Sequence, residues 1–178
     1  MMAPGKFKRI IKHLWLDASD TNRAMPPDVF KRLTGQVAAS ENLHTGQIRI
    51  CVETSLPISY LWRLGSEVGI KQLIRQRAVM LFGKLRVWDT EHNNGVLIYL
   101  QLAERSIEVV ADRGLSRHVP NEEWQAMTQR MSMAFREGRF EDGLGLAIDE
   151  VSTLLLTHFP AVAGVSRPDE LPNEPVLG

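Results

Sequence analysis

The sequence has little cysteine, no excess of either charge and no long apolar run. Its 178 residues include one cysteine, Cys51, which excludes an intramolecular disulfide and a cysteine-based zinc site. Positive and negative side chains number 21 each, so we expect no nucleic-acid partner. No apolar run approaches the roughly 20 residues that span a bilayer. The remaining composition, 44% hydrophobic and 24% charged, is that of an ordinary globular protein.

The N-terminus has a basic start but neither the apolar region nor the cleavage site of a secretion signal. We therefore expect a cytoplasmic protein. Residues 5–16 repeat apolar side chains at helical spacing, with four cationic side chains between them. Two states fit this pattern: an amphipathic helix in peripheral contact with an anionic membrane, and a helix packed on the domain. The shortness of the segment favours the packed helix.

Hydrophobic periodicity divides the rest of the chain into strands and helices. Alternating or continuous apolar residues predict strands at residues 47–53, 96–100 and 107–111. Apolar residues at helical spacing predict helices at residues 27–42, 66–85, 121–138 and 140–159.

This order predicts an α/β fold. A small mixed β-sheet contains a βαβ crossover and a hairpin, and helices pack on its faces. The crossover makes strands 47–53 and 96–100 parallel. Strand 96–100 is apolar throughout and belongs in the middle of a sheet that is covered on both faces.

The chain contains no linker that would divide two domains. We expect one domain at residues 27–159, preceded by an N-terminal arm at residues 1–26. Residues 160–178 carry several prolines and few apolar residues in their second half, which predicts a flexible C-terminal tail.

Several kinds of catalytic motif are missing. The only close glycine pair lies in a helical pattern, so there is no phosphate-binding loop. Cys51 lies in the middle of a predicted strand and is followed six residues later by Pro57, where a cysteine phosphatase loop would have arginine. No serine lies in a nucleophile elbow, and the five histidines show no zinc spacing.

Oxygen-bearing residues flank the predicted hairpin at both of its chain ends. Antiparallel pairing brings these two ends together at one end of the sheet. The candidate ligands of a calcium ion or another divalent cation there are Asp89, Glu91, Asn93, Asn94 and Asp112, with His92 beside them.

Structural roles for the same residues compete with metal binding. Asn94 and Gly95 can form a simple turn. Asp89 can cap a local turn, and Asp112 can pair with a nearby arginine. No EF-hand spacing is present to favour a metal.

The stretch NNGVLIYLQLAERSIEVVADRGL, with LFGKLRVWDTEH before it, resembles the TPM-domain family, formerly a domain of unknown function. The resemblance covers about residues 27–159. The WDTEHNNGVLIYL signature is similar to the corresponding sequence of a short bacterial subgroup of the family. It implies an α/β sandwich fold. Asn93, Asn94 and Gly95 match the family motif, whereas Asp112 and Gly114 stand in a turn that is poorer in glycine than usual.

The resemblance also implies a divalent ion at loops around the sheet ends in some members and weak acid phosphatase activity in some. Many members are exported or anchored in membranes. Two hypotheses follow. The first is an accessory or binding domain that takes a divalent ion and an unidentified protein partner. The second is a weak metal-dependent phosphatase that acts on phosphate monoesters, in which His92 could assist proton transfer.

Overall fold

A computed structural model describes residues 4–16, 18–65, 68–162 and 170–178. Its α-helices are α1 (Pro4–Trp15), α2 (Ala18–Ala24), α3 (Pro27–Glu41), α4 (Ile58–Leu61), α5 (Ile70–Lys84), α6 (Arg113–Ser116), α7 (Asn121–Arg136) and α8 (Phe140–His158). Its strands are β1 (Gln47–Glu53), β2 (Gly95–Gln101), β3 (Ser106–Ala111) and β4 (Val176–Leu177).

The four strands form one mixed sheet in the order β3-β2-β1-β4. Strands β1 and β2 are parallel, with Gln47 opposite Gly95, and β2 and β3 form an antiparallel hairpin. Every residue of β2 is buried, as the predicted central strand requires. The predicted α/β fold with its crossover, hairpin and flanking helices is therefore confirmed.

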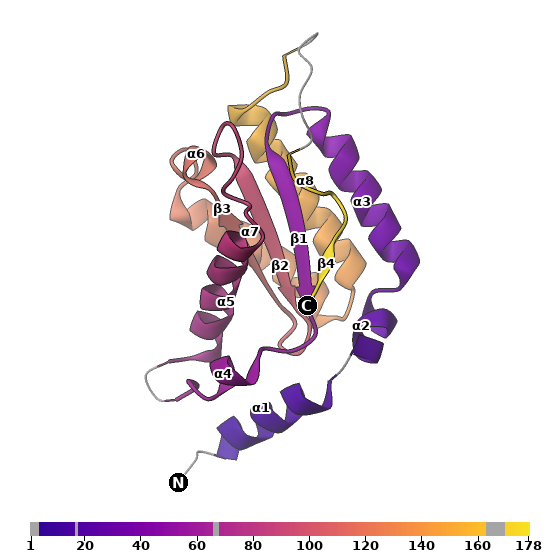
Figure 1. Cartoon of the computed structure of the whole chain (residues 1–178), viewed down its shortest axis with the longest axis vertical. Coiled ribbons are helices and arrows are strands. Elements are labelled where there is room, and N and C mark those ends of the chain that lie inside the picture. Colours follow the sequence, from indigo (N-terminus) through magenta and orange to yellow (C-terminus); the bar gives the residue numbers. More distant parts are fainter. Residues whose placement is uncertain (1–3, 17, 66–67, 163–169) are drawn as a thin grey trace.

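Helices cover both faces of the sheet (Figure 1). One apolar cluster joins α3, α7 and α8 to one face, where Val96, Ile98 and Leu100 of β2 point. The other cluster joins α4 and α5 to the opposite face, around Leu97 and Tyr99. The alternation of β2 thus supplies both clusters from one strand.

The N-terminal arm contributes to the core more than its sequence predicts. Met25 is fully buried in the cluster beneath α3 and α8. Thr21 is also buried, and its hydroxyl forms a hydrogen bond with the Thr54 hydroxyl after β1. The packed unit therefore begins before Pro27. The expected arm also includes residues 1–3 and 17, which lie outside the described residues.

The C-terminal tail differs from the expected flexible segment. Val176 and Leu177 pair in parallel with Cys51 and Val52, and Leu171 is buried in the α5-side cluster. Two strand residues are too few to produce a periodic signal, so their backbone pairing could not be read from the sequence. Residues 163–169 of the expected tail lie outside the described residues.

Among the described helices, none is both long enough and apolar enough to span a membrane.

Candidate functional site

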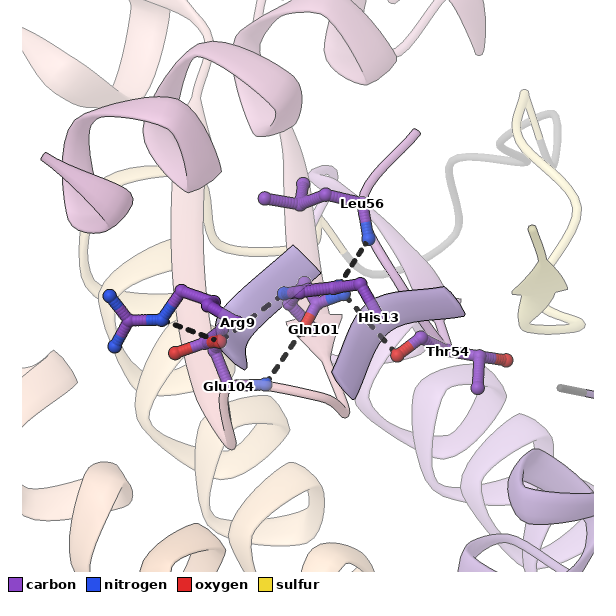
Figure 2. A network of polar contacts seen from close by, with 6 residues as sticks. All are labelled: Arg9, His13, Thr54, Leu56, Gln101 and Glu104. Carbon is purple, nitrogen blue, oxygen red and sulfur yellow. Dashed lines mark hydrogen bonds and ion pairs between the residues drawn. The ribbon is translucent and has the colours of Figure 1, made fainter. Parts of the chain in front are cut away.

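Helix α1 is fastened to the sheet end where β1 and β2 finish (Figure 2). The Leu56 backbone N–H donates to Nδ1 of His13, so Nδ1 is an acceptor and Nε2 carries the ring hydrogen. Nε2 lies 3.2 Å from a Glu104 carboxylate oxygen, to which it donates. Arg9 donates to the same carboxylate at 3.1 Å. Helix α1 therefore contacts the rest of the domain through Arg9 and His13.

The pKa of Glu104 lies below its usual value. Burial acts to raise the pKa, but the hydrogen bond from His13 and the charges of Arg9 and Lys12 outweigh burial. Gln101 extends this network, because its side-chain oxygen accepts from the Glu104 backbone N–H. Each group in the network has a partner, which indicates a docking contact for α1 rather than a reaction centre.

A second buried polar group lies where β1 ends. The Glu53 carboxylate accepts hydrogen bonds from Nε and one terminal nitrogen of the Arg77 guanidinium. It also accepts one of 2.7 Å from the Tyr99 hydroxyl. Burial and the Glu53 charge raise the pKa of Tyr99, and they raise the pKa of the neighbouring Cys51 thiol to about 12. A thiol that stays protonated is a poor nucleophile, so Cys51 is structural.

The opposite end of the sheet holds the residues that the sequence singled out. Two backbone hydrogen bonds join the loop before β2 to the chain after β3: Asp112 N–H donates to Gly95 at 2.9 Å, and Gly114 N–H donates to Asn93 at 2.8 Å. Gly114 packs so closely that an added Cβ would overlap the carbonyl oxygens of His92 and Asn93. The two flanks of the hairpin therefore meet, as antiparallel pairing predicts.

Not all the predicted ligands point into this junction. Asp89 pairs with Arg86 on the surface. The Asn93 side-chain oxygen accepts from Nε of Arg113 at 3.0 Å. Glu91 and His92 are exposed. In the described ranges, no three His, Cys, Asp or Glu side chains form a group that could hold a metal ion.

Two side-chain oxygen atoms of residues that flank the hairpin are buried without a hydrogen-bond partner among the described residues. They are Oδ1 of Asn94, a residue with no exposed surface, and Oδ2 of Asp112. The other polar atoms of these side chains are satisfied: the Asn94 amide donates to Thr45 at 3.1 Å, and Oδ1 of Asp112 accepts from the Arg113 N–H at the start of α6. A buried oxygen without a donor is unfavourable unless something electropositive approaches it.

These oxygens fit a hard cation better than a transition metal. Calcium is bound by carboxylate, amide and backbone carbonyl oxygens, and Asp112, Asn94 and the backbone of residues 92–93 carry these three oxygen types. Zinc and its neighbours favour histidine and cysteine ligands, and the described residues at this end supply no such group.

Sequence reasoning missed one acidic residue at this end of the sheet. Glu170 follows the undescribed segment, and its carboxylate accepts from the Glu91 backbone N–H at 3.1 Å. The Gln47 side-chain oxygen in turn accepts from the backbone N–H groups of Glu170 and Leu171, each at 3.0 Å. Glu170 lies 79 residues from Glu91 in the chain, and no local pattern connects them.

The fold and this junction define a small α/β sandwich domain with an oxygen-lined end of its sheet. The chain belongs to the TPM domain family, whose model, TPM phosphatase, matches residues 19–154.

Solved structures that share this fold include the following two. The BA42 protein of the psychrophilic bacterium Bizionia argentinensis is 23% identical, with a TM-score of 0.71 over 86% of this chain and 95% of that one. The N-terminal domain of a P. gingivalis protein is 20% identical, with a TM-score of 0.52 over 77% of this chain and 82% of that one. No curated protein matches the sequence.

Proposed function

We propose that this TPM domain is an accessory binding module that takes up one divalent cation, calcium in the first place, at the Asn94–Asp112 junction. The observation that carries the proposal is the pair of buried oxygens without hydrogen-bond donors in two loops that are joined by backbone hydrogen bonds. A bound cation would neutralise the Asp112 carboxylate and hold the loop before β2 against α6. The protein partner and the contact of residues 5–16 with a membrane surface stay predictions.

Calorimetric titration with calcium, magnesium and manganese tests the cation. We expect the wild type to bind calcium weakly, with a Kd of about 0.1–1 mM, because the site has few charged ligands. Asp112→Asn keeps the shape of the side chain and removes its charge, and should weaken binding at least about tenfold. Asp89→Asn is the matched control, because Asp89 pairs with Arg86 on the surface and should leave the affinity unchanged.

Two results would contradict the cation proposal. One is the absence of any binding below the millimolar range. The other is equal affinity of the wild type and Asp112→Asn, which would leave the Asp112 carboxylate with only its role in capping α6.

A metal-dependent phosphatase is the second candidate, and the name of the family model favours it. The cation would polarise a phosphoryl oxygen and activate water. Hydrolysis of p-nitrophenyl phosphate by the wild type, Asp112→Asn and Asp89→Asn separates the two functions. The phosphatase hypothesis is supported if hydrolysis depends on calcium or magnesium and falls in Asp112→Asn but not in Asp89→Asn. The binding-module hypothesis is supported if cations bind but neither substitution alters hydrolysis.

A further inference from the structure

Strand β3 forms one edge of the sheet, and its outward backbone groups follow from the register. Asp112 is hydrogen-bonded to Gly95, so the hydrogen-bonded pairs along the hairpin continue at Val110, Glu108 and Ser106. The residues between them, Ile107, Val109 and Ala111, point their N–H and C=O groups away from β2. The outward carbonyl of Val109 confirms this alternation, because it accepts from Arg75 at 2.7 Å.

A groove of about 820 Å³ lies along this edge. Helix α5 supplies one wall and α7 the other, and most residues of β3 line the floor. The walls include apolar side chains such as Ile70 of α5 and Trp124 of α7. A floor made of a strand edge, with apolar side chains to both sides, has the form of a site for an added β-strand.

The charges around the groove favour an acidic occupant. Its cationic lining residues are Arg9, Lys71, Arg75, Arg105 and Arg136, and its acidic ones are Glu104 and Glu108. Both carboxylates already have arginine partners, Arg9 and Arg75. Within the described part of the chain, Lys71, Arg105 and Arg136 form no ion pair. The groove is therefore positively charged.

Arg75 also protects the edge of β3 against unspecific strand pairing. Charged side chains on an edge strand commonly prevent unspecific pairing. The Arg75 side chain is about half exposed and holds Glu108 at 3.4 Å, a loose pair. An incoming strand whose backbone N–H donates to the Val109 carbonyl would displace Arg75 from it, and an acidic side chain on that strand would form an ion pair with the freed guanidinium. Arg75 thereby favours an acidic strand over a neutral or basic one.

The other edge of the sheet shows that this sheet accepts a short added strand. Val176 and Leu177 pair with β1 after a chain excursion of more than 120 residues, and the two edges lie on opposite sides of the sheet (Figure 1). We propose that β3 receives an extended acidic segment of a partner protein as a fifth strand, in the groove between α5 and α7. The inference rests on the proposed binding role but is independent of the cation.

The experiment is a titration of the full ¹⁵N-labelled chain with a capped peptide of about eight residues that alternates glutamate and valine. We expect the amides of Ile107, Val109 and Ala111 to shift and to gain protection from hydrogen exchange, while those of Glu108 and Val110 change little. A peptide that alternates lysine and valine should not bind. Repeating the titration in EDTA separates this site from the cation site, since peptide binding should persist.

Two N-methylated versions of the glutamate peptide provide the decisive control. Each carries methyl groups on alternate backbone nitrogens, and the two differ in which alternate set is blocked. Strand addition uses one set only, so one peptide should lose binding and the other should keep it. Equal binding by both would overturn the inference in favour of unspecific charge attraction, and absence of binding by the unmethylated peptide would overturn it outright.

Charge-reversal variants locate the contact on the protein. Lys71→Glu, in the α5 wall, should weaken the glutamate peptide at least about fivefold at low salt. Lys31→Glu is the matched control, because Lys31 is an exposed residue of α3 outside the groove lining. It should change the affinity less than about twofold. Equal losses in both variants would show that only net charge matters and would overturn the assignment of the groove.

Discussion

Single residues decide how close the two flanks of the hairpin can come. Gly95 and Gly114 both stand where an added Cβ would overlap a backbone carbonyl oxygen, that of Val87 for Gly95 and those of His92 and Asn93 for Gly114. Backbone atoms cannot turn aside as a flexible side chain can. Asn93 supports the same turn with φ of 52°, a left-handed conformation that asparagine tolerates better than most residues.

Replacing Gly114 by alanine should force the two loops apart. We expect Gly114→Ala to lower the free energy of unfolding by about 2 kcal/mol or more, as overpacking against backbone does, and to abolish calcium binding at the junction. Urea denaturation and calorimetry measure the two effects. Gly35→Ala on α3 is the control, since an added Cβ there meets nothing within 4 Å and should stabilise the helix by up to about 1 kcal/mol. A Gly114→Ala protein as stable as the wild type would contradict the close approach.

Individual residues also mark how far the sequence could predict the site. The sequence brought Asn94 and Asp112 to one end of the sheet, because strand pairing follows from periodicity. It could not show that Asp89 turns to Arg86, because that turn depends on a left-handed Arg86 with φ of 56°. It could not find Glu170, whose contact with Glu91 depends on the path of the tail.

At the scale of elements, long periodic segments were predictable and short ones were not. Strand β1 occupies its predicted bounds, and the predicted helix at residues 140–159 corresponds to α8, because each repeats its apolar side chains over several periods. The single-turn helices α4 and α6 and the two-residue β4 are too short to show any period. The start of the predicted helix at residues 66–85 includes residues 66–67, which lie outside the described residues.

Helix α1 is an element whose attachment should depend on pH. The folded-state pKa of Glu104 is lowered, so ionised Glu104 stabilises the folded protein. That stabilisation is fully present above the ordinary glutamate pKa of about 4.5 and is lost as the pH falls through the lower folded-state value. Removing the charge of Glu104 should therefore lower the free energy of unfolding at pH 7 but not in acid.

Glu104→Gln tests this dependence. We expect it to lower the free energy of unfolding by about 1.5–3 kcal/mol at pH 7, which is the usual contribution of a charged hydrogen bond, and by much less at pH 3. Urea denaturation at the two pH values measures the difference. Glu137→Gln serves as the control, because Glu137 is an exposed partner of Arg139. A loss that is equal at both pH values would exclude the charge of Glu104 as its cause.

At the scale of the whole molecule, the fold is a single unit that includes both ends of the described chain. Ile10 of α1 packs on the α5-side cluster, and Leu171 of the tail is buried in the same cluster. Arg49 of β1 also donates to the backbone oxygens of Pro172 and Glu174. The tail therefore completes the covering of one face of the sheet.

Two leucines of the tail should differ in their effect on stability. Leu171 is 6% exposed and Leu177 is 50% exposed. We expect Leu171→Ala to lower the free energy of unfolding by about 2–4 kcal/mol, and Leu177→Ala by less than about 1 kcal/mol. Chemical denaturation of the two variants measures this. If both variants lose equally little free energy of unfolding, the tail does not pack as described and is the flexible segment that its composition predicts.

The pairing of β4 with β1 makes the reactivity of Cys51 a measure of how often β4 detaches from the sheet. Val176 lies opposite Cys51, and the Cys51 thiol is the only one in the sequence. A two-residue strand can detach in local openings that leave the rest of the sheet folded. Such an opening removes a neighbour from a thiol that burial otherwise keeps protonated. The rate at which a disulfide reagent modifies the native chain should therefore follow the frequency with which β4 leaves the sheet.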